Sequence, residues 1–135
     1  MLSGVPSTAW ALVRGTDPLA PSLAAGAMLL PNASGRSAML GAAAVVHATL
    51  SLGWAHILAA GARAPTTTQG LLRGAAAGLA IAAVDLALAH AVRSPRLERV
   101  RALPVLPQVA DHVVYGALVG GLLPRRERRE RRALT

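Results

Sequence analysis

The chain contains no cysteine, phenylalanine or lysine, and only 2% of its residues are aromatic. The lack of cysteine excludes disulfide bonds, thiolate metal sites and a cysteine nucleophile. Charged residues make up 15% of the 135 residues, whereas about a quarter is usual for a soluble domain. The remaining mass is mostly Ala, Leu, Val and Gly, which favours a membrane protein over a soluble one.

The positive charge lies at the ends of apolar segments. All fourteen positive charges are arginine, and six of them fall in 125–132 and four more in 93–101. This placement predicts contact with anionic lipid headgroups. No aromatic residue interleaves the tail to stack on bases, so we predict no nucleic-acid partner. Arginine without lysine, with abundant Ala, Gly and Pro, is typical of a GC-rich genome and predicts a bacterial cytoplasmic-membrane protein.

Two apolar segments, 37–62 and 70–92, exceed the roughly 20 residues that a helix needs to cross a bilayer. The polar connection between them, 63–69, is short, so we expect the two helices to form an antiparallel hairpin. The third segment, 102–123, carries two prolines near its start. It either spans the bilayer or begins with an interfacial stretch and forms a shorter span.

In residues 1–36 we predict two short helices, separated at "RGTD". These helices lie in the membrane interface or span only part of the bilayer. Alternatively, translation starts upstream and the first apolar run is the end of a spanning helix. The predicted fold class is all-α, an integral membrane helical bundle of three to four apolar helices plus short interfacial helices. Its transmembrane bundle covers 37–123, and 124–135 is an arginine-rich cytoplasmic tail.

The predicted orientation rests on a count of arginines. With the tail in the cytoplasm, eight arginines of the bundle and tail lie inside and five lie outside, which is a weak bias. If the third segment is re-entrant instead, both arginine clusters are cytoplasmic.

Small residues predict a close-packing face along 70–92. Gly70, Gly74 and Gly78 recur at every fourth position, and small residues let helix backbones approach one another in lipid. At 100° per residue, Asp85 falls about 60° from Gly70 and so shares this face. His90 falls about 200° away and points elsewhere.

The third segment contains an adjacent acid and base, Asp111 and His112. His112 shares a helix face with Gly116 and Gly120, which predicts a second packing face. Asp111 points in another direction and lies in the first turns, where the helix dipole favours an acid. We expect Asp111 to cap the start of its own helix or to form an ion pair with the arginines of 93–101.

Asp85 lies deepest among the acids of the apolar segments. A charge at that depth costs about 2.5–3.5 kcal/mol unless it is paired, so it marks a candidate functional site. Asp85 and His47 each lie 15 residues from an end of the 63–69 connection, about 22 Å from the same membrane face. We predict a hydrogen bond between them that holds the hairpin in register. The alternative is a role for this pair with a proton, an ion or a cofactor, with His112 as a third member if the last helix spans.

The sequence contains no phosphate-binding glycine loop, HExxH motif or GxSxG motif. We therefore name no catalytic residue, and an enzyme is the weakest of three functional classes. His47 and His112 could supply axial haem ligands, or a metal site together with Asp85. Single histidines in helices are more often packed or hydrogen-bonded, so we predict no cofactor and no metal.

Four stretches, "GVPSTAWAL", "DPLAPSLAAGAMLLP", "HATLSLGWAHILA" and "RALPVLPQVADHVVYGALVGG", together resemble a set of small actinobacterial multi-pass membrane proteins of unknown function. The resemblance covers most of the chain outside 63–69 and the tail. It is most specific at 101–121, with the pattern RALPxxPQxADHxxYGxxxG. It implies a membrane location and architecture, with no activity, cofactor or catalytic residue to transfer.

Two main functional classes follow from these observations. In a structural or interaction protein, the small-residue faces pack within the bundle, against a second copy or against another membrane protein. Changing Asp85 or His47 then lowers the abundance of the protein. In a small proton- or ion-linked transporter that uses this pair, the same changes leave abundance intact and abolish transport.

Overall fold

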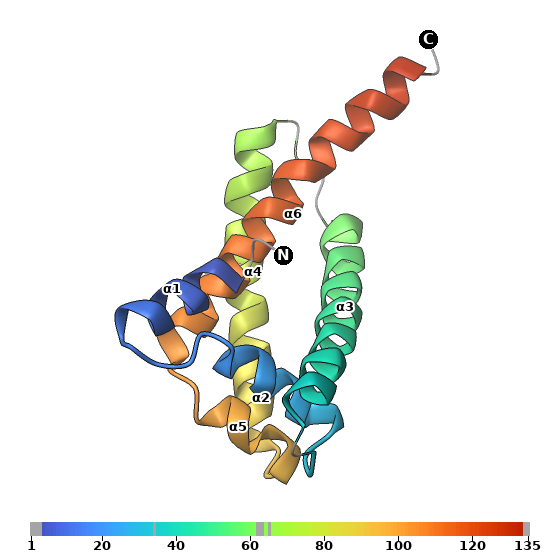
Figure 1. Ribbon diagram of the computed structural model, residues 1–135. Coiled ribbons are helices and arrows are strands. Elements are labelled where there is room, and N and C mark those ends of the chain that lie inside the picture. The colour runs from blue at the N-terminus through green and yellow to red at the C-terminus, as the bar shows by residue number, and fades with distance from the viewer. Residues whose placement is uncertain (1–3, 34, 62–63, 65, 134–135) are drawn as a thin grey trace.

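The computed structural model describes residues 4–33, 35–61, 64 and 66–133, with side chains up to residue 123. Its elements are α1 (Val5–Val13), α2 (Ala20–Leu29), α3 (Arg36–Gly61), α4 (Thr67–Ala91), the 3₁₀ turn η2 (Pro95–Leu97), α5 (Glu98–Arg101) and α6 (Val105–Ala133) (Figure 1). Within the described residues there is no strand, so the predicted all-α class is confirmed. The predicted contact of the arginine tail with headgroups falls on side chains outside the described part.

Three helices are long and apolar enough to cross a membrane: α3, α4 and the Val105–Leu123 part of α6. α6 begins directly after Pro104, and Pro107 lies in its first turn, where a missing backbone N–H breaks no helical hydrogen bond. The first two helices, α1 and α2, have 9 and 10 residues, which is too short to cross a bilayer.

Arginines from the segment between α4 and α6 bind the ends of two helices. Arg101 donates to the carbonyl oxygens of Ala89 and Val92 at the end of α4, at 3.2 and 3.1 Å. Arg96 donates to the carbonyl oxygen of Met28 near the end of α2, at 3.1 Å. The last carbonyls of a helix lack backbone partners and carry partial negative charge, so cations stabilise them.

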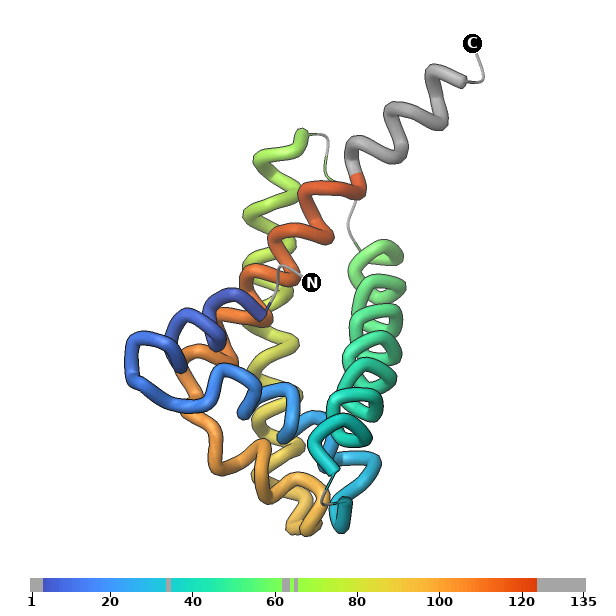
Figure 2. Tube along the Cα trace, in the orientation of Figure 1, coloured from blue at the N-terminus to red at the C-terminus, as the bar shows by residue number. Residues whose placement is uncertain are grey.

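The closest helix pair is α4 and α6, which run side by side in opposite directions (Figures 1 and 2). A Cβ atom added to Gly116 would overlap the carbonyl oxygen of Gly74 and lie 2.9 Å from the Cα of Gly78. A Cβ on Gly120 would overlap the carbonyl oxygen of Gly70 and lie 2.9 Å from the Cα of Gly74. All five glycines of the two predicted packing faces therefore meet in one backbone-to-backbone contact.

The main neighbour of α3 is α2 rather than α4. Gly26 of α2 lies against the backbone of Met39, and Ala25 packs with Ala43 and Val46 of α3. The predicted hairpin thus keeps its antiparallel direction, but α3 and α4 make few contacts with each other. The reason is that α6 occupies the small-residue face of α4.

Candidate functional site

A short stretch of α6, "DHVVYG" at 111–116, sends each of its three polar side chains to a different helix. Polar groups in an apolar environment are stable only when hydrogen-bonded, so these contacts determine how the helices sit around α6. We call this set of side chains the α6 polar cluster. Its members are Asp111 with Ser7 of α1, His112 with Asp85 of α4, and Tyr115 with the backbone of Ser51 of α3.

His112 is the partner of Asp85. The distance from His112 Nε2 to Asp85 Oδ2 is 3.2 Å, and each side chain is 28% exposed. The other ring nitrogen, Nδ1, lies 2.7 Å from the backbone carbonyl oxygen of Gln108. The predicted bond between Asp85 and His47 is thus not the one that forms. Asp85 lies on the small-residue face of α4, and it is α6 rather than α3 that packs there.

Asp111 caps a helix, but the helix is α1 rather than its own. The backbone N–H of Ser7 donates to Asp111 Oδ1 at 3.1 Å, and the Ser7 hydroxyl donates to Oδ2. Ser7 is in the first turn of α1, and the residue at the N-cap, Gly4, has no side chain to satisfy these N–H groups. The predicted ion pair of Asp111 with the arginines of 93–101 does not form among the described residues. Asp111 accepts from Ser7, and Arg96 and Arg101 bind helix carbonyls instead.

The remaining histidines lie outside the bonded pairs of the cluster. His47 is exposed on α3, near enough to Asp111 for a Coulombic interaction. His56 and His90 are also exposed, and the Nδ1 of each lies 2.8 Å from the carbonyl oxygen four residues earlier. His90 thus points away from the packing face of α4, as its helical position indicates.

Sequence reasoning missed Ser7 and Tyr115 as members of the cluster. The available signal for Tyr115 is its hydroxyl, which needs a hydrogen-bond partner when the ring lies in an apolar helix. Its hydroxyl donates to the backbone carbonyl of Ser51, which links α6 to α3. For Ser7 the sequence holds no comparable signal, because a serine near a helix start is usually explained by local capping.

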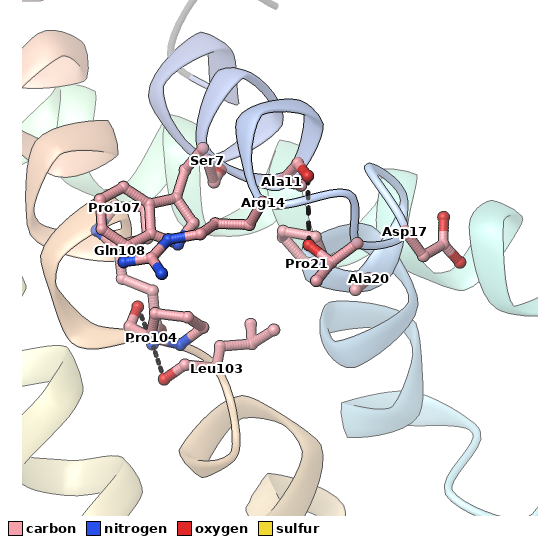
Figure 3. Close-up of a pocket in the computed structure, with 12 residues that line it drawn as sticks. Ser7, Ala11, Arg14, Asp17, Ala20, Pro21, Leu103, Pro104, Pro107 and Gln108 are labelled. Atoms are coloured by element: carbon pink, nitrogen blue, oxygen red, sulfur yellow. Dashed lines mark hydrogen bonds between the residues drawn. The ribbon is translucent and has the colours of Figure 1, made fainter.

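A groove of about 580 Å³ lies between α1, the start of α2 and the start of α6 (Figure 3). Ser7, which bonds Asp111, and Gln108, whose backbone carbonyl bonds His112 Nδ1, both line it. Arg14 and Asp17 are exposed and also line the groove, and the Arg14 guanidinium carbon lies 4.9 Å from the centre of the Trp10 ring. The groove therefore joins exposed charged groups to the α6 polar cluster.

Asp85 and His112 lie at about a third of a hydrocarbon-core thickness from the ends of their helices. At 1.5 Å per residue, His112 stands about 10 Å from the start of α6 and Asp85 about 9 Å from the end of α4, against a hydrocarbon core of about 30 Å. Among the described residues no three His, Asp or Glu side chains gather as a metal ion requires. An acid bonded to an imidazole can instead hold and exchange a proton.

No protein-family description, curated protein or solved structure matches the chain at a significant level. Its class therefore rests on its own features, which are an all-α fold and three helices able to cross a membrane.

Proposed function

We propose that the chain is a multi-pass protein of the bacterial cytoplasmic membrane with a structural or interaction role. The observation that supports this role is that polar residues within the spans bond one helix to another. Asp85, Asp111 and Tyr115 each take part in a bond between two helices. The resemblance to small actinobacterial membrane proteins, carried by the pattern at 101–121, supports the same location.

The proposed orientation places the arginine tail in the cytoplasm. Gly120 lies against Gly70, so α6 leaves the bundle at the end where α4 begins, and the arginines of the tail follow there in sequence. At the opposite end, Arg36 forms an ion pair and Arg96 and Arg101 bind helix carbonyls. These arginines therefore have structural partners within the protein. The arginines of the tail are the ones that indicate the cytoplasmic side.

Membrane abundance tests the structural role. Asp85→Ala and His112→Ala each remove one partner of the pair, so both variants should be depleted from membranes when expressed from the same promoter as the wild type. His90→Ala is the matched control, because His90 is an exposed histidine on the same helix as Asp85. Full abundance of all three variants would contradict the structural role.

Affinity purification of the tagged protein from membranes tests the interaction role. Recovery of a stoichiometric membrane-protein partner, or of a second copy carrying a different tag, supports it. A protein that arrives alone and as a monomer restricts the role to the chain's own architecture.

A proton- or ion-linked transporter is the second candidate function. The favouring observation is an acid bonded to an imidazole within the spans, together with a groove that Ser7 and Gln108 of neighbouring bonds line. His112 replaces His47 as the partner of Asp85 in this candidate. Variants of Asp85 that accumulate normally but lose a proton-coupled flux in vesicles would favour transport over a structural role.

A further inference from the structure

The contact between His112 and Asp85 contains one proton. His112 Nδ1 lies 2.7 Å from a backbone carbonyl oxygen, which can only accept, so Nδ1 carries a hydrogen. The hydrogen bond from Nε2 to Asp85 Oδ2, at 3.2 Å, then needs one further hydrogen. That hydrogen sits either on an imidazolium facing a carboxylate or on a neutral acid facing a neutral ring. In both forms the pair is neutral, and the proton can move between the two atoms without changing its charge.

His56 and His90 provide an internal comparison. Both make the same backbone bond through Nδ1, at 2.8 Å, and both are exposed. In the part of the chain that the structure describes, His112 pairs with an acid, whereas His56 and His90 do not. The shared proton is therefore a property of the α6 polar cluster and does not follow from the backbone bond that the three histidines have in common.

Two residues that line the groove bond the polar side chains of α6, at His112 Nδ1 and at Asp111. Gln108, whose carbonyl bonds His112, lines the groove, as does Ser7, whose N–H and hydroxyl bond Asp111 (Figure 3). Asp111 precedes His112 in the chain and accepts hydrogen bonds from Ser7 alone among the described residues. It has lone pairs that could accept a proton on its way to water.

We propose that Asp85 and His112 form a proton-binding site inside the membrane that exchanges with water through the groove, with Asp111 as the intermediate acceptor. On release, the bond from the proton to Nε2 or Oδ2 breaks and an O–H bond forms on the Asp111 carboxylate, which leaves the pair with one negative charge. The Asp111 O–H bond then breaks as a water molecule takes the proton and becomes hydronium, and Asp111 returns to the carboxylate. Rebinding reverses these steps. The site goes beyond a structural role and does not depend on it.

The groups that act on His112 are Asp85 on α4 and the Gln108 carbonyl and Asp111 on α6, and Asp111 in turn interacts with groups on α1 and α3. Asp111 accepts from Ser7 on α1 and interacts with His47 on α3, and Arg14 lines the groove. Asp111 and His47 lie within Coulombic reach of each other, so the charge of either group changes the energy of a proton in the cluster.

Nitrogen-15 NMR of the histidine rings in lipid nanodiscs tests the site. Spectra of the full chain are recorded over roughly pH 5–8, where histidine charge changes occur. Asp85→Asn should change the titration midpoint of His112 by about one pH unit or more, because it removes the facing charge. The ring signals of His56 and His90 should be the same in this variant as in the wild type. An equal response of the three histidines, or no response, overturns the proposal.

If Asp85→Asn does not accumulate, the wild-type spectrum tests the proposal through the protonation of the two His112 ring nitrogens. A His112 ring with its hydrogen on Nδ1 and a hydrogen-bonded Nε2 agrees with the proton count. A ring with a bare Nδ1 and its only hydrogen on Nε2 contradicts it. His112→Gln assigns the signal.

Single-cysteine labelling tests the route, because the chain has no cysteine of its own. Gln108→Cys places a thiol in the groove, and Leu88→Cys places one at a similar depth on the exposed face of α4. A membrane-impermeant methanethiosulfonate should modify the cysteine at 108 and leave the one at 88 unmodified. Equal protection of both cysteines would show that water does not enter the groove.

Discussion

The α4–α6 contact and the surface of α3 contain the same residue type with opposite outcomes. In the first, Gly74, Gly78 and Gly116 press backbone against backbone. On α3, Gly41 and Gly53 have nothing within 4 Å of an added Cβ. The glycines of α4 recur every four residues on one face, whereas those of α3 do not. Spacing rather than glycine content therefore determines which helices meet closely.

The two regions are also held by different forces. No hydrophobic force joins helices in lipid, so α4 and α6 depend on van der Waals contact at short range and on the Asp85–His112 bond. α3 depends on its packing with α2, on the Arg36–Asp17 ion pair at its start and on a hydrogen bond from Tyr115. Changes in the first region should therefore cost more than changes in the second.

Gly116→Ala should have the largest effect. Its methyl group would overlap the backbone of Gly74 and crowd Gly78, and a backbone cannot move aside as a flexible side chain can. We expect a loss of about 3 kcal/mol in the free energy of unfolding, measured by denaturant titration in mixed micelles. Gly53→Ala is the matched control, and it should be neutral or slightly stabilising because alanine favours the helix. Equal losses would show that α4 and α6 do not pack as described.

Asp85→Ala should have the next largest effect. It leaves His112 without its partner within the membrane and should lower the free energy of unfolding by about 1–2 kcal/mol. His90→Ala should change it little, because the His90 ring is exposed. A double-mutant cycle with His112→Ala isolates the energy of the pair. A coupling energy of zero would show that this bond does not stabilise the protein.

Asp111→Asn should release α1 with little effect on α4 and α6. The variant weakens the bonds to Ser7 at the start of α1, for which capping energies of about 1 kcal/mol are typical. Hydrogen exchange should become faster in α1 and stay unchanged in α4. Ser7→Ala removes only the hydroxyl and should show a smaller effect in the same direction. Unchanged exchange in α1 for both variants would refute the cap.

Tyr115→Phe should have the smallest effect. Loss of one hydrogen bond to Ser51 should cost about 0.6 kcal/mol, the average for such bonds in membrane proteins. Spin labels at Ile57→Cys and Leu118→Cys should show a broader distance distribution between α3 and α6. A label pair on Leu72→Cys and Leu118→Cys should keep its distribution, because the glycine contact between α4 and α6 is intact. Broadening of both distributions would mean that Tyr115 holds the whole bundle.

Much of the fold could be predicted because it depends on single helices. Apolar length indicates the three spans, and fourfold glycine spacing together with helical geometry places Asp85 and His112 on the packing faces. The partner of Asp85 could not be predicted in the same way. Depth and the short connection favoured His47, but depth alone does not say which helix occupies a given face. The Ser7–Asp111 bond joins residues 104 positions apart, and no local pattern indicates it.

Composition and periodicity by themselves determined that this chain forms apolar helices, where small-residue faces lie on them and which acid lies within a span. Only the tertiary structure decided that the two glycine faces meet each other and that His112, Asp111 and Tyr115 bind three different helices. The physical reason is that a helix face is a property of one segment, whereas its partner depends on how closely two backbones can approach. Glycines on both sides make the α4–α6 approach the closest, and the polar bonds of α6 then place α1 and α3 around that pair.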